Sequence, residues 1–363
     1  MAHWLVRLTQ VTRRRGLMFG VLTLFVAVAL WSWWAESHPR HERRLRVLVH
    51  EQLDDWFPGQ MAPVDGWHGI HRRTAPTVSH GPRVLLVHGL DEPGSIWDDL
   101  TPALAASGFE VWEFRYPNDQ GIDRSTDYLA THWGELPIDR PVVLIGHSMG
   151  GLVIRDFVTR LRYPAATPPR VDGPAIAGVV LVGTPNQGSE WARLRVWLEL
   201  RDHLSNGPGR RLSLFAALRD GTGEAKIDLR PGSDFLVDLN ARPWPTKVPS
   251  LVIEGRLLTP TPDLSAGLKA VAAEVHSTEL SRRLEAWWSG LGEDLGDGVV
   301  SLDSARLPGG PPPLVFDASH RGLLLRQLPG AAEPPAIAPI LATLNYWSTD
   351  AVSDQLPEPQ DPS

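Results

Sequence analysis

The stretch Pro141–Gly151, with the sequence PVVLIGHSMGG, decides the fold of this chain. Its apolar residues Val142–Ile145 are typical of a strand that is buried on both faces of a parallel sheet. This strand leads into a G-x-S-x-G pentapeptide, Gly146–Gly150, and apolar residues at helical spacing follow the pentapeptide. A strand, a glycine-flanked serine and a helix are the context in which this motif forms a nucleophile elbow.

Ser148 stands at the centre of this predicted turn. Gly146 and Gly150 on either side allow neighbouring backbone to come close, and the N-terminus of the following helix favours developing negative charge. The alternative is a tight glycine turn in which the serine has no catalytic role. We interpret Ser148 as the nucleophile, because the elements on both sides are those that an elbow needs.

The composition of the chain excludes several classes of function. Its 363 residues are 42% hydrophobic and 21% charged, as in a globular protein with a sizeable core. A net charge of −7 argues against nucleic acid as a partner. Because the chain has no cysteine, disulfides, thiolate metal sites and cysteine nucleophiles are excluded. We find no metal-binding motif, and we expect no metal and no cofactor.

The N-terminal region contains a predicted membrane anchor, Gly16–Ala35, which has no charged residue and is long enough to span a bilayer. Three arginines precede it and three tryptophans lie at its far end. The alternative is a signal peptide that is cleaved near Ala27–Ala29. We expect an uncleaved single-pass anchor with the folded domain outside the cytoplasm. Arginines also follow the anchor, so the positive-inside rule discriminates weakly and the orientation stays open.

The rest of the chain divides into a linker, one large domain and a tail. We expect a basic N-terminus over 1–15, an anchor over 16–35, a linker over 36–82 with a short amphipathic helix at 45–58, a domain over 83–349 and a disordered tail over 350–363. Within the domain, buried strands are predicted at Arg83–Val87, Phe109–Arg115, Gly178–Val182, Ser250–Glu254 and Pro313–Phe316, with helices at Trp97–Ala106 and Ile122–Trp133. This alternation predicts an α/β protein with a mainly parallel, doubly wound sheet.

Two insertions, 186–249 and 257–295, interrupt the alternation of strands and helices. Both follow predicted strands, and ligands of such sheets bind beyond the carboxyl ends of the strands. We interpret one or both insertions as a helical cap or lid over the site, and surface decoration is the alternative.

A serine nucleophile needs a base within hydrogen-bond reach, and the base needs an acid that orients it. In a sheet of this kind the acid and then the histidine follow the serine along the chain. We predict His320 as the base, because it comes directly after the last predicted strand. The other two histidines after Ser148, His203 and His276, fall in the insertions.

The acid should follow a strand end and precede His320. Asp297 lies 23 positions before His320 (320 − 297) and is bracketed by glycines, so we predict it as the acid. Asp303 and Asp294 remain rivals, whereas Asp317 is too close to the histidine. An aspartate between glycines is also a common turn residue, and that is the structural alternative.

A tetrahedral intermediate also needs donors for its oxyanion. We predict the backbone N–H of Met149, directly after the nucleophile, and that of Leu90, in the His88-Gly89-Leu90 loop after the first buried strand. His88 precedes the serine, so we expect it to order this loop through ring hydrogen bonds rather than to act as the base.

Together these residues resemble an α/β-hydrolase of the lipase type, similar to bacterial triacylglycerol lipases and to deacylases of inositol-linked lipids. The resemblance spans most of the chain after the linker. It rests on LLVHGL (85–90), GHSMGG (146–151), GTPNQGS (183–189), FLVDLN (235–240), GDGVVS (296–301) and ASH (318–320). Bacterial lipases commonly have a calcium site and often a disulfide, but this sequence has no cysteine and no evident cluster of calcium ligands.

The resemblance implies the α/β-hydrolase fold and a role for each matched residue. It implies Ser148 as nucleophile, Asp297 as acid and His320 as base, with Leu90 and Met149 as oxyanion donors. The loop that contains Thr184, Pro185, Gly188 and Ser189 would be structural, and His88, Gly89, Gly146 and Gly150 would support the site.

The implied function is a membrane-anchored serine hydrolase that cleaves carboxylic esters through an acyl-enzyme. Acyl lipids are the expected substrates, because an anchor and a tryptophan-rich cap would bring the site to a membrane. An acyltransferase or an amidase with the same triad is the alternative. A further alternative is a non-catalytic membrane scaffold with this fold.

Overall fold

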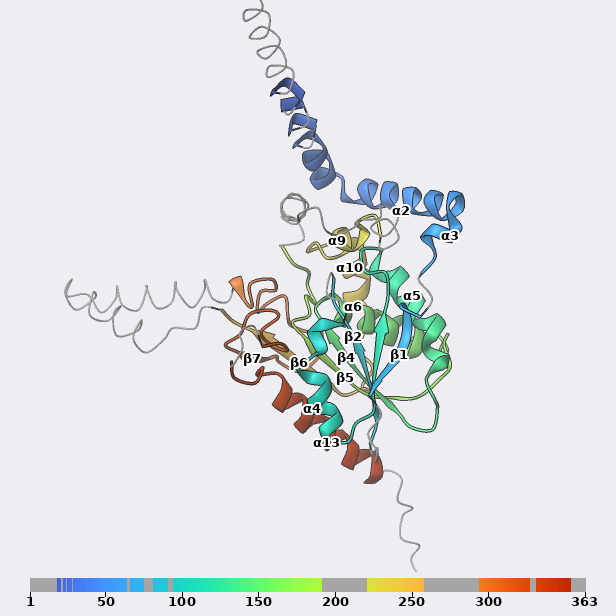
Figure 1. The fold of residues 1–363 in the computed structure, drawn as a ribbon, viewed down its shortest axis with the longest axis vertical. Helices are drawn as coiled ribbons and strands as arrows, with labels where there is room; N and C mark the ends of the chain where they lie inside the picture. Colours follow the sequence, from blue (N-terminus) through green and yellow to red (C-terminus); the bar gives the residue numbers. More distant parts are fainter. Residues whose placement is uncertain are drawn as a thin grey trace, which may run out of the picture.

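The structure, a computed structural model, describes residues 18–20, 22–23, 25–27, 29–63, 66–74, 81–90, 94–190, 221–257, 294–326 and 331–353. In these residues, one seven-stranded sheet has the order β1-β3-β2-β4-β5-β6-β7 (Figure 1). Its strands are β1 (Gly69–Thr74), β2 (Arg83–Val87), β3 (Val111–Arg115), β4 (Val142–His147), β5 (Ile176–Val182), β6 (Ser250–Gly255) and β7 (Leu314–Phe316). All neighbouring strands are parallel except β1 and β3, which are antiparallel.

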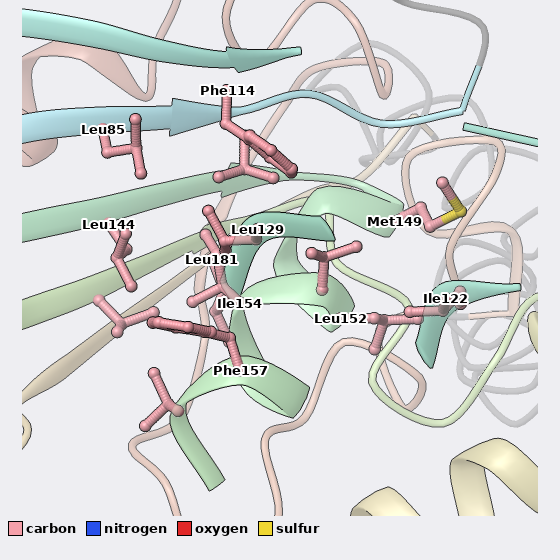
Figure 2. Packing of buried hydrophobic residues seen from close by; sticks show 14 of the residues in the cluster. Leu85, Phe114, Ile122, Leu129, Leu144, Met149, Leu152, Ile154, Phe157 and Leu181 are labelled. Atoms are coloured by element: carbon pink, nitrogen blue, oxygen red, sulfur yellow. The ribbon is translucent and has the colours of Figure 1, made fainter. Parts of the chain in front are cut away.

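Helices cover both faces of the sheet because the central strands are apolar on both sides. Successive side chains of a strand point to opposite faces, so Leu85 and Val87 of β2 lie in one core and Val84 and Leu86 in the other. The first core includes side chains of α5 (Ile122–His132) and α6 (Met149–Asp156), as Figure 2 shows. The second includes side chains of α4 (Leu100–Ala106) and α13 (Ile337–Ser353).

The shorter elements connect this framework. They are the α-helices α2 (Pro39–Trp56), α3 (Pro58–Met61), α9 (Glu224–Asp228) and α10 (Asp234–Asn240), the 3₁₀ turns η1 (Ser95–Trp97) and η2 (Trp133–Glu135), and the π-helical turn η3 (Phe157–Arg162) that extends α6. A further helix, Met18–Ser37, is long and apolar enough to cross a membrane, and signal sequences near an N-terminus pass the same test.

The predicted mainly parallel α/β sheet is confirmed, and two of the predicted boundaries are wrong. The segment 36–82 is not only a linker, because Gly69–Thr74 within it pairs with β3 as the edge strand β1. This strand reads GIHRRT and presents one apolar side chain to the core, Ile70, so it has no buried run. The predicted tail also starts too early, because α13 continues to Ser353.

The amphipathic helix predicted at 45–58 is part of α2, which begins earlier, at Pro39. Proline fits the first turn of a helix, where its missing N–H leaves no partner unsatisfied. The predicted insertions lie partly outside the described residues, which include 186–190, 221–249, 257 and 294–295 of them. Within this part, α9 and α10 follow the carboxyl end of β5.

Candidate active site

The elbow predicted around Ser148 is a sharp turn between β4 and α6. Ser148 has φ +53° and ψ −127°, and no other non-glycine residue in the described part of the chain has a positive φ. Such a backbone costs of order 1–3 kcal/mol and persists where the surrounding structure holds it, often at functional sites. Here the Ser148 N–H donates to the Val182 carbonyl at 2.9 Å, and the Gly151 N–H donates to the Ser148 carbonyl at 3.1 Å.

The glycines of the motif allow α6 to start against the end of β2. A Cβ atom on Gly150 would lie 2.1 Å from the carbonyl oxygen of Val87 and 2.5 Å from that of His88. A Cβ atom on Gly146 would lie 2.6 Å from the backbone nitrogen of Gly151. Backbone atoms cannot give way as a flexible side chain can, so both positions require glycine in this arrangement.

The loop after β2 lies against the nucleophile. A Cβ atom on Gly89 would approach the Ser148 Cβ to 2.8 Å, so glycine brings this loop to the serine. The buried His88 ring stacks on Tyr116 at 4.6 Å between centroids, and its Nδ1 lies 2.8 Å from the Gly89 carbonyl. The Tyr116 hydroxyl donates to the His88 carbonyl at 2.7 Å. These contacts hold the backbone that precedes Leu90, as expected of a loop-ordering histidine.

His320 and Asp297 form a buried pair on the other side of the elbow. The His320 Nδ1 lies 2.6 Å from the Asp297 Oδ2, and the His320 backbone N–H donates to the Asp297 carbonyl at 2.9 Å. The second carboxylate oxygen, Oδ1, accepts the N–H groups of Val299 and Val300 at 2.9 and 2.8 Å. Because backbone donors fix one carboxylate oxygen, the other is aimed at the Nδ1 of the imidazole.

The turn after β5 brings this pair to the serine. A Cβ atom on Gly183 would lie 3.0 Å from the His320 ring and 3.3 Å from the Asp297 Oδ2, while Val182 before it binds the Ser148 N–H. The His147 ring also lies beside the His320 ring, 4.6 Å between centroids. The predicted serine, histidine and aspartate therefore converge on one turn at the carboxyl edge of the sheet.

A family model described as the alpha/beta hydrolase family matches residues 84–358. The chain belongs to the alpha/beta hydrolase family. Solved structures share this fold: the mature Bacillus licheniformis lipase BlEst2 has 18% identity and a TM-score of 0.50, and the match covers 75% of this chain and 97% of that one. The Staphylococcus hyicus lipase has 12% identity and a TM-score of 0.50, with 79% and 100% of the chains covered. No curated protein matches the sequence.

The predicted resemblance to α/β-hydrolases of the lipase type is thereby confirmed. The loop Gly183–Ser189 contacts the segment that holds Asp297. The Ser189 hydroxyl donates to the Val299 carbonyl at 2.6 Å, next to the N–H groups that hold Asp297. Thr184 is buried, and its Oγ1 would be 2.0 Å from a Cβ atom on Gly151. The loop Gly183–Ser189 thus packs between the elbow and the acid.

Glu254, at the end of β6, is a site residue that the sequence analysis does not identify. Its buried carboxyl accepts the Gly255 N–H through Oε1 at 3.1 Å, and Oε2 has no N–H or O–H donor among the described residues. The side chain lies next to that of Asp297, and a hydrogen bond between the two carboxyl groups requires that one of them carries a proton. No motif marks this glutamate, because it ends an ordinary buried strand.

The electrostatics of the pair assign the proton to Glu254. Burial and the Asp297 charge raise the pKa of Glu254 well above its ordinary value. Burial alone would raise the pKa of Asp297 too, but the charge and hydrogen bond of His320, together with the Glu254 hydrogen bond, lower that pKa below its ordinary value. Asp297 is therefore the ionised partner that faces the imidazole.

The other candidate acids are exposed, whereas Asp297 is buried. The Asp303 side chain is 92% exposed and pairs with Arg306 at 3.2 Å, and Asp294 and Asp317 are exposed. His203 and His276 lie outside the described residues. Among the residues that are described, no group of three or more His, Cys, Asp or Glu side chains is placed to hold a metal ion.

Proposed function

We propose that this α/β-hydrolase cleaves carboxylic esters through an acyl-enzyme, with Ser148 as nucleophile, His320 as base and Asp297 as acid. The observation that supports this most is the strained Ser148 beside a buried imidazole–carboxylate pair with Nδ1 and Oδ2 2.6 Å apart. A serine hydroxyl is a weak nucleophile at its own pKa, and an oriented imidazole is what activates it.

In the proposed reaction, the Ser148 oxygen attacks the ester carbonyl while His320 takes the hydroxyl proton at Nε2. Asp297 holds the Nδ1–H tautomer and stabilises the imidazolium that forms. The N–H groups of Leu90 and Met149 stabilise the oxyanion. His320 then protonates the leaving alcohol, the acyl group stays on Ser148, and water activated by His320 releases the acid.

Acyl lipids are the substrates that we propose. Two proteins of similar fold are named as lipases, those of Bacillus licheniformis and Staphylococcus hyicus. The apolar helix Met18–Ser37, which we propose as an uncleaved anchor with the domain outside the cytoplasm, would keep the site at a lipid surface. We assign the segments 186–249 and 257–295 to a cap over the site, where they would contact the acyl chain.

The test is hydrolysis of p-nitrophenyl esters of increasing chain length, together with labelling by a fluorophosphonate probe. We expect Ser148→Ala to lose both hydrolysis and labelling, because it lacks the attacking oxygen. Ser107→Ala is the matched control, since Ser107 lies at the end of α4 on the other face of the sheet, and it should keep both. Turnover by Ser148→Ala at the rate of the unsubstituted chain would refute the proposal.

A further inference from the structure

The helix α2 has one face that is fixed to the domain. Its Arg43 pairs with the buried Asp228 at 2.7 Å and with Asp123 at 2.9 Å. On the same face, His50 lies 3.3 Å from Glu224 of α9. The Arg43 ion pairs and the His50 contact lie two turns apart on one face and prevent α2 from rolling, so the opposite face keeps a defined direction.

That opposite face is exposed and carries four apolar side chains, with the exposed Gln52 between them. Leu48 is 62% exposed and Trp56 67%, and Leu45 and Val49 are exposed beside them. Leu48 and Val49 follow Leu45 by three and four positions, and Trp56 follows them by eight and seven, so the four residues form a single stripe on the helix. Exposed Arg44 lies next to the stripe, while Glu51 and Asp55 lie towards its other end. Apolar side chains rather than charge therefore dominate the stripe, which we name the outer stripe of α2.

The position of α2 in the chain identifies what this stripe would meet. It begins two residues after Met18–Ser37, the described helix that is apolar enough to cross a membrane and is 7% buried over its most apolar window. In Figure 1 that helix stands clear of the folded body, and α2 lies across the body beside α9. A helix that leaves a bilayer and turns at a proline comes to lie at the interface, where apolar side chains and tryptophan are favoured.

We propose that the outer stripe of α2 lies on the surface of a lipid bilayer and fixes how the hydrolase domain sits on it. The contacts of the inner face would then transmit this orientation to α9, which follows the carboxyl end of β5. Ser148 is at the same edge of the sheet. The site would therefore face lipids from a constant height rather than swing freely on the anchor.

The proposal rests on the proposed anchor, and the absence of cysteine in the chain allows a test that separates the two. Single substitutions Leu48→Cys, Leu22→Cys and Ile138→Cys would each carry an environment-sensitive fluorophore. The full chain would be placed in vesicles of phosphatidylcholine and phosphatidylglycerol. Ile138 is the matched control, because it is an apolar residue that is 79% exposed and precedes β4, at the other end of the strands.

Two quenchers report the depth of each label. At position 48 we expect quenching by lipids with a nitroxide near the headgroup, and quenching by aqueous iodide several-fold weaker than at position 138. At position 22 we expect quenching by nitroxides deep in the acyl chain. Hydrolysis of a short soluble ester should be unchanged in all three variants, which would show that the domain is folded.

The outcomes separate the anchor from the interfacial helix. If label 22 is deep and label 48 is as accessible to iodide as label 138, the anchor stands and our proposal for α2 is wrong. If neither label meets lipid, both are wrong. A disulfide that forms readily between two copies of unlabelled Leu48→Cys would show that the stripe binds a second chain, which also overturns the proposal.

Discussion

The buried carboxyl groups of Glu254 and Asp297 lie next to each other, and Asp297 also binds the imidazole of His320. The Asp297 carboxylate has three hydrogen-bond partners, two backbone N–H groups and the imidazole, and a protonated Glu254 would be a fourth donor. Each one favours the ionised form of Asp297. A neutral glutamic acid can supply such a donor without adding a second negative charge.

Substitutions of Glu254 should separate its hydrogen bond from its volume. Glu254→Ala leaves Asp297 without this donor, and we expect kcat to fall about 10- to 100-fold, because a hydrogen bond to a charged group contributes about 1.5–3 kcal/mol. Glu254→Gln keeps an N–H donor of similar size and should keep most of the activity. Steady-state hydrolysis of a p-nitrophenyl ester measures both.

A purely structural role for Glu254 would give a different pattern. In that case both variants would lower the folded fraction, and kcat per folded site, counted by fluorophosphonate labelling, would not change. We expect KM to stay within a factor of a few, since Glu254 lies behind the acid and does not contact substrate. Equal kcat per labelled site in Glu254→Ala and the unsubstituted chain would contradict the role inferred from the geometry.

Replacement of the triad acid should have the largest effect after loss of the serine. Asp297→Asn keeps an oxygen for the Val299 and Val300 N–H groups but presents an amide to His320, which holds the wrong ring tautomer. We expect kcat about 10,000-fold lower with the fold retained. Asp303→Asn is the matched control and should be fully active, since Asp303 is exposed and pairs with Arg306. Similar losses in both variants would disprove this assignment of the acid.

The central sheet could be predicted from the sequence because its central strands are buried on both faces. Apolar runs such as Arg83–Val87 and Val142–Ile145 have no other stable environment in a domain of this size. The edge strand β1 escaped prediction because Ile70 is its one apolar side chain in the core and His71, Arg72 and Arg73 follow it. Edge strands commonly carry charges, and such a pattern is hard to tell from a loop.

The same contrast applies to the site. Ser148, Asp297 and His320 could be proposed from motif and order, since Ser148 and His320 follow predicted strands and Asp297 stands between glycines before the histidine. Glu254 could not, because it is the last side chain of an ordinary strand and its partner is 43 positions away (297 − 254). Similarly, nothing local shows that α2 is fixed to α9, because Arg43 and Asp228 are joined only by the fold.

The glycine requirement of the elbow gives a prediction about stability. Gly150→Ala places a methyl group 2.1 Å from the Val87 carbonyl oxygen, and we expect a loss of about 3 kcal/mol or more, since overpacking against backbone cannot relax. Gly134→Ala is the control, because a Cβ atom there would meet nothing within 4 Å. That substitution should be neutral or slightly stabilising. Thermal unfolding of both proteins, followed by circular dichroism, would compare them, and equal midpoints would refute the close approach.

The pair of Arg43 and Asp228 makes the docking of α2 depend on pH. Burial raises the pKa of Asp228 to about 6, although Arg43 and the Ile122 N–H favour the ionised form. In the unfolded chain this pKa is about 3.9. A carboxyl whose pKa is higher in the folded chain than in the unfolded chain stabilises the fold fully at pH values below the unfolded pKa. This contribution is lost as the pH rises through the folded pKa.

Removal of the arginine should therefore destabilise the protein more at higher pH. Arg43→Gln takes away the countercharge, so the folded pKa of Asp228 rises further and the ionised form becomes more costly. We expect a loss of about 2 kcal/mol at about pH 8 and much less at about pH 5, where Asp228 is already largely protonated. This expected loss is smaller than for a fully buried ion pair, because the Arg43 side chain is 28% exposed.

Urea unfolding in detergent at both pH values measures the difference, with Arg40→Gln as control. Arg40 and Asp234 are both exposed, so their pair should contribute little at either pH. An equal loss for Arg43→Gln at the two pH values would mean that Asp228 does not titrate in this range, and the docking of α2 would then rest on contacts other than this ion pair.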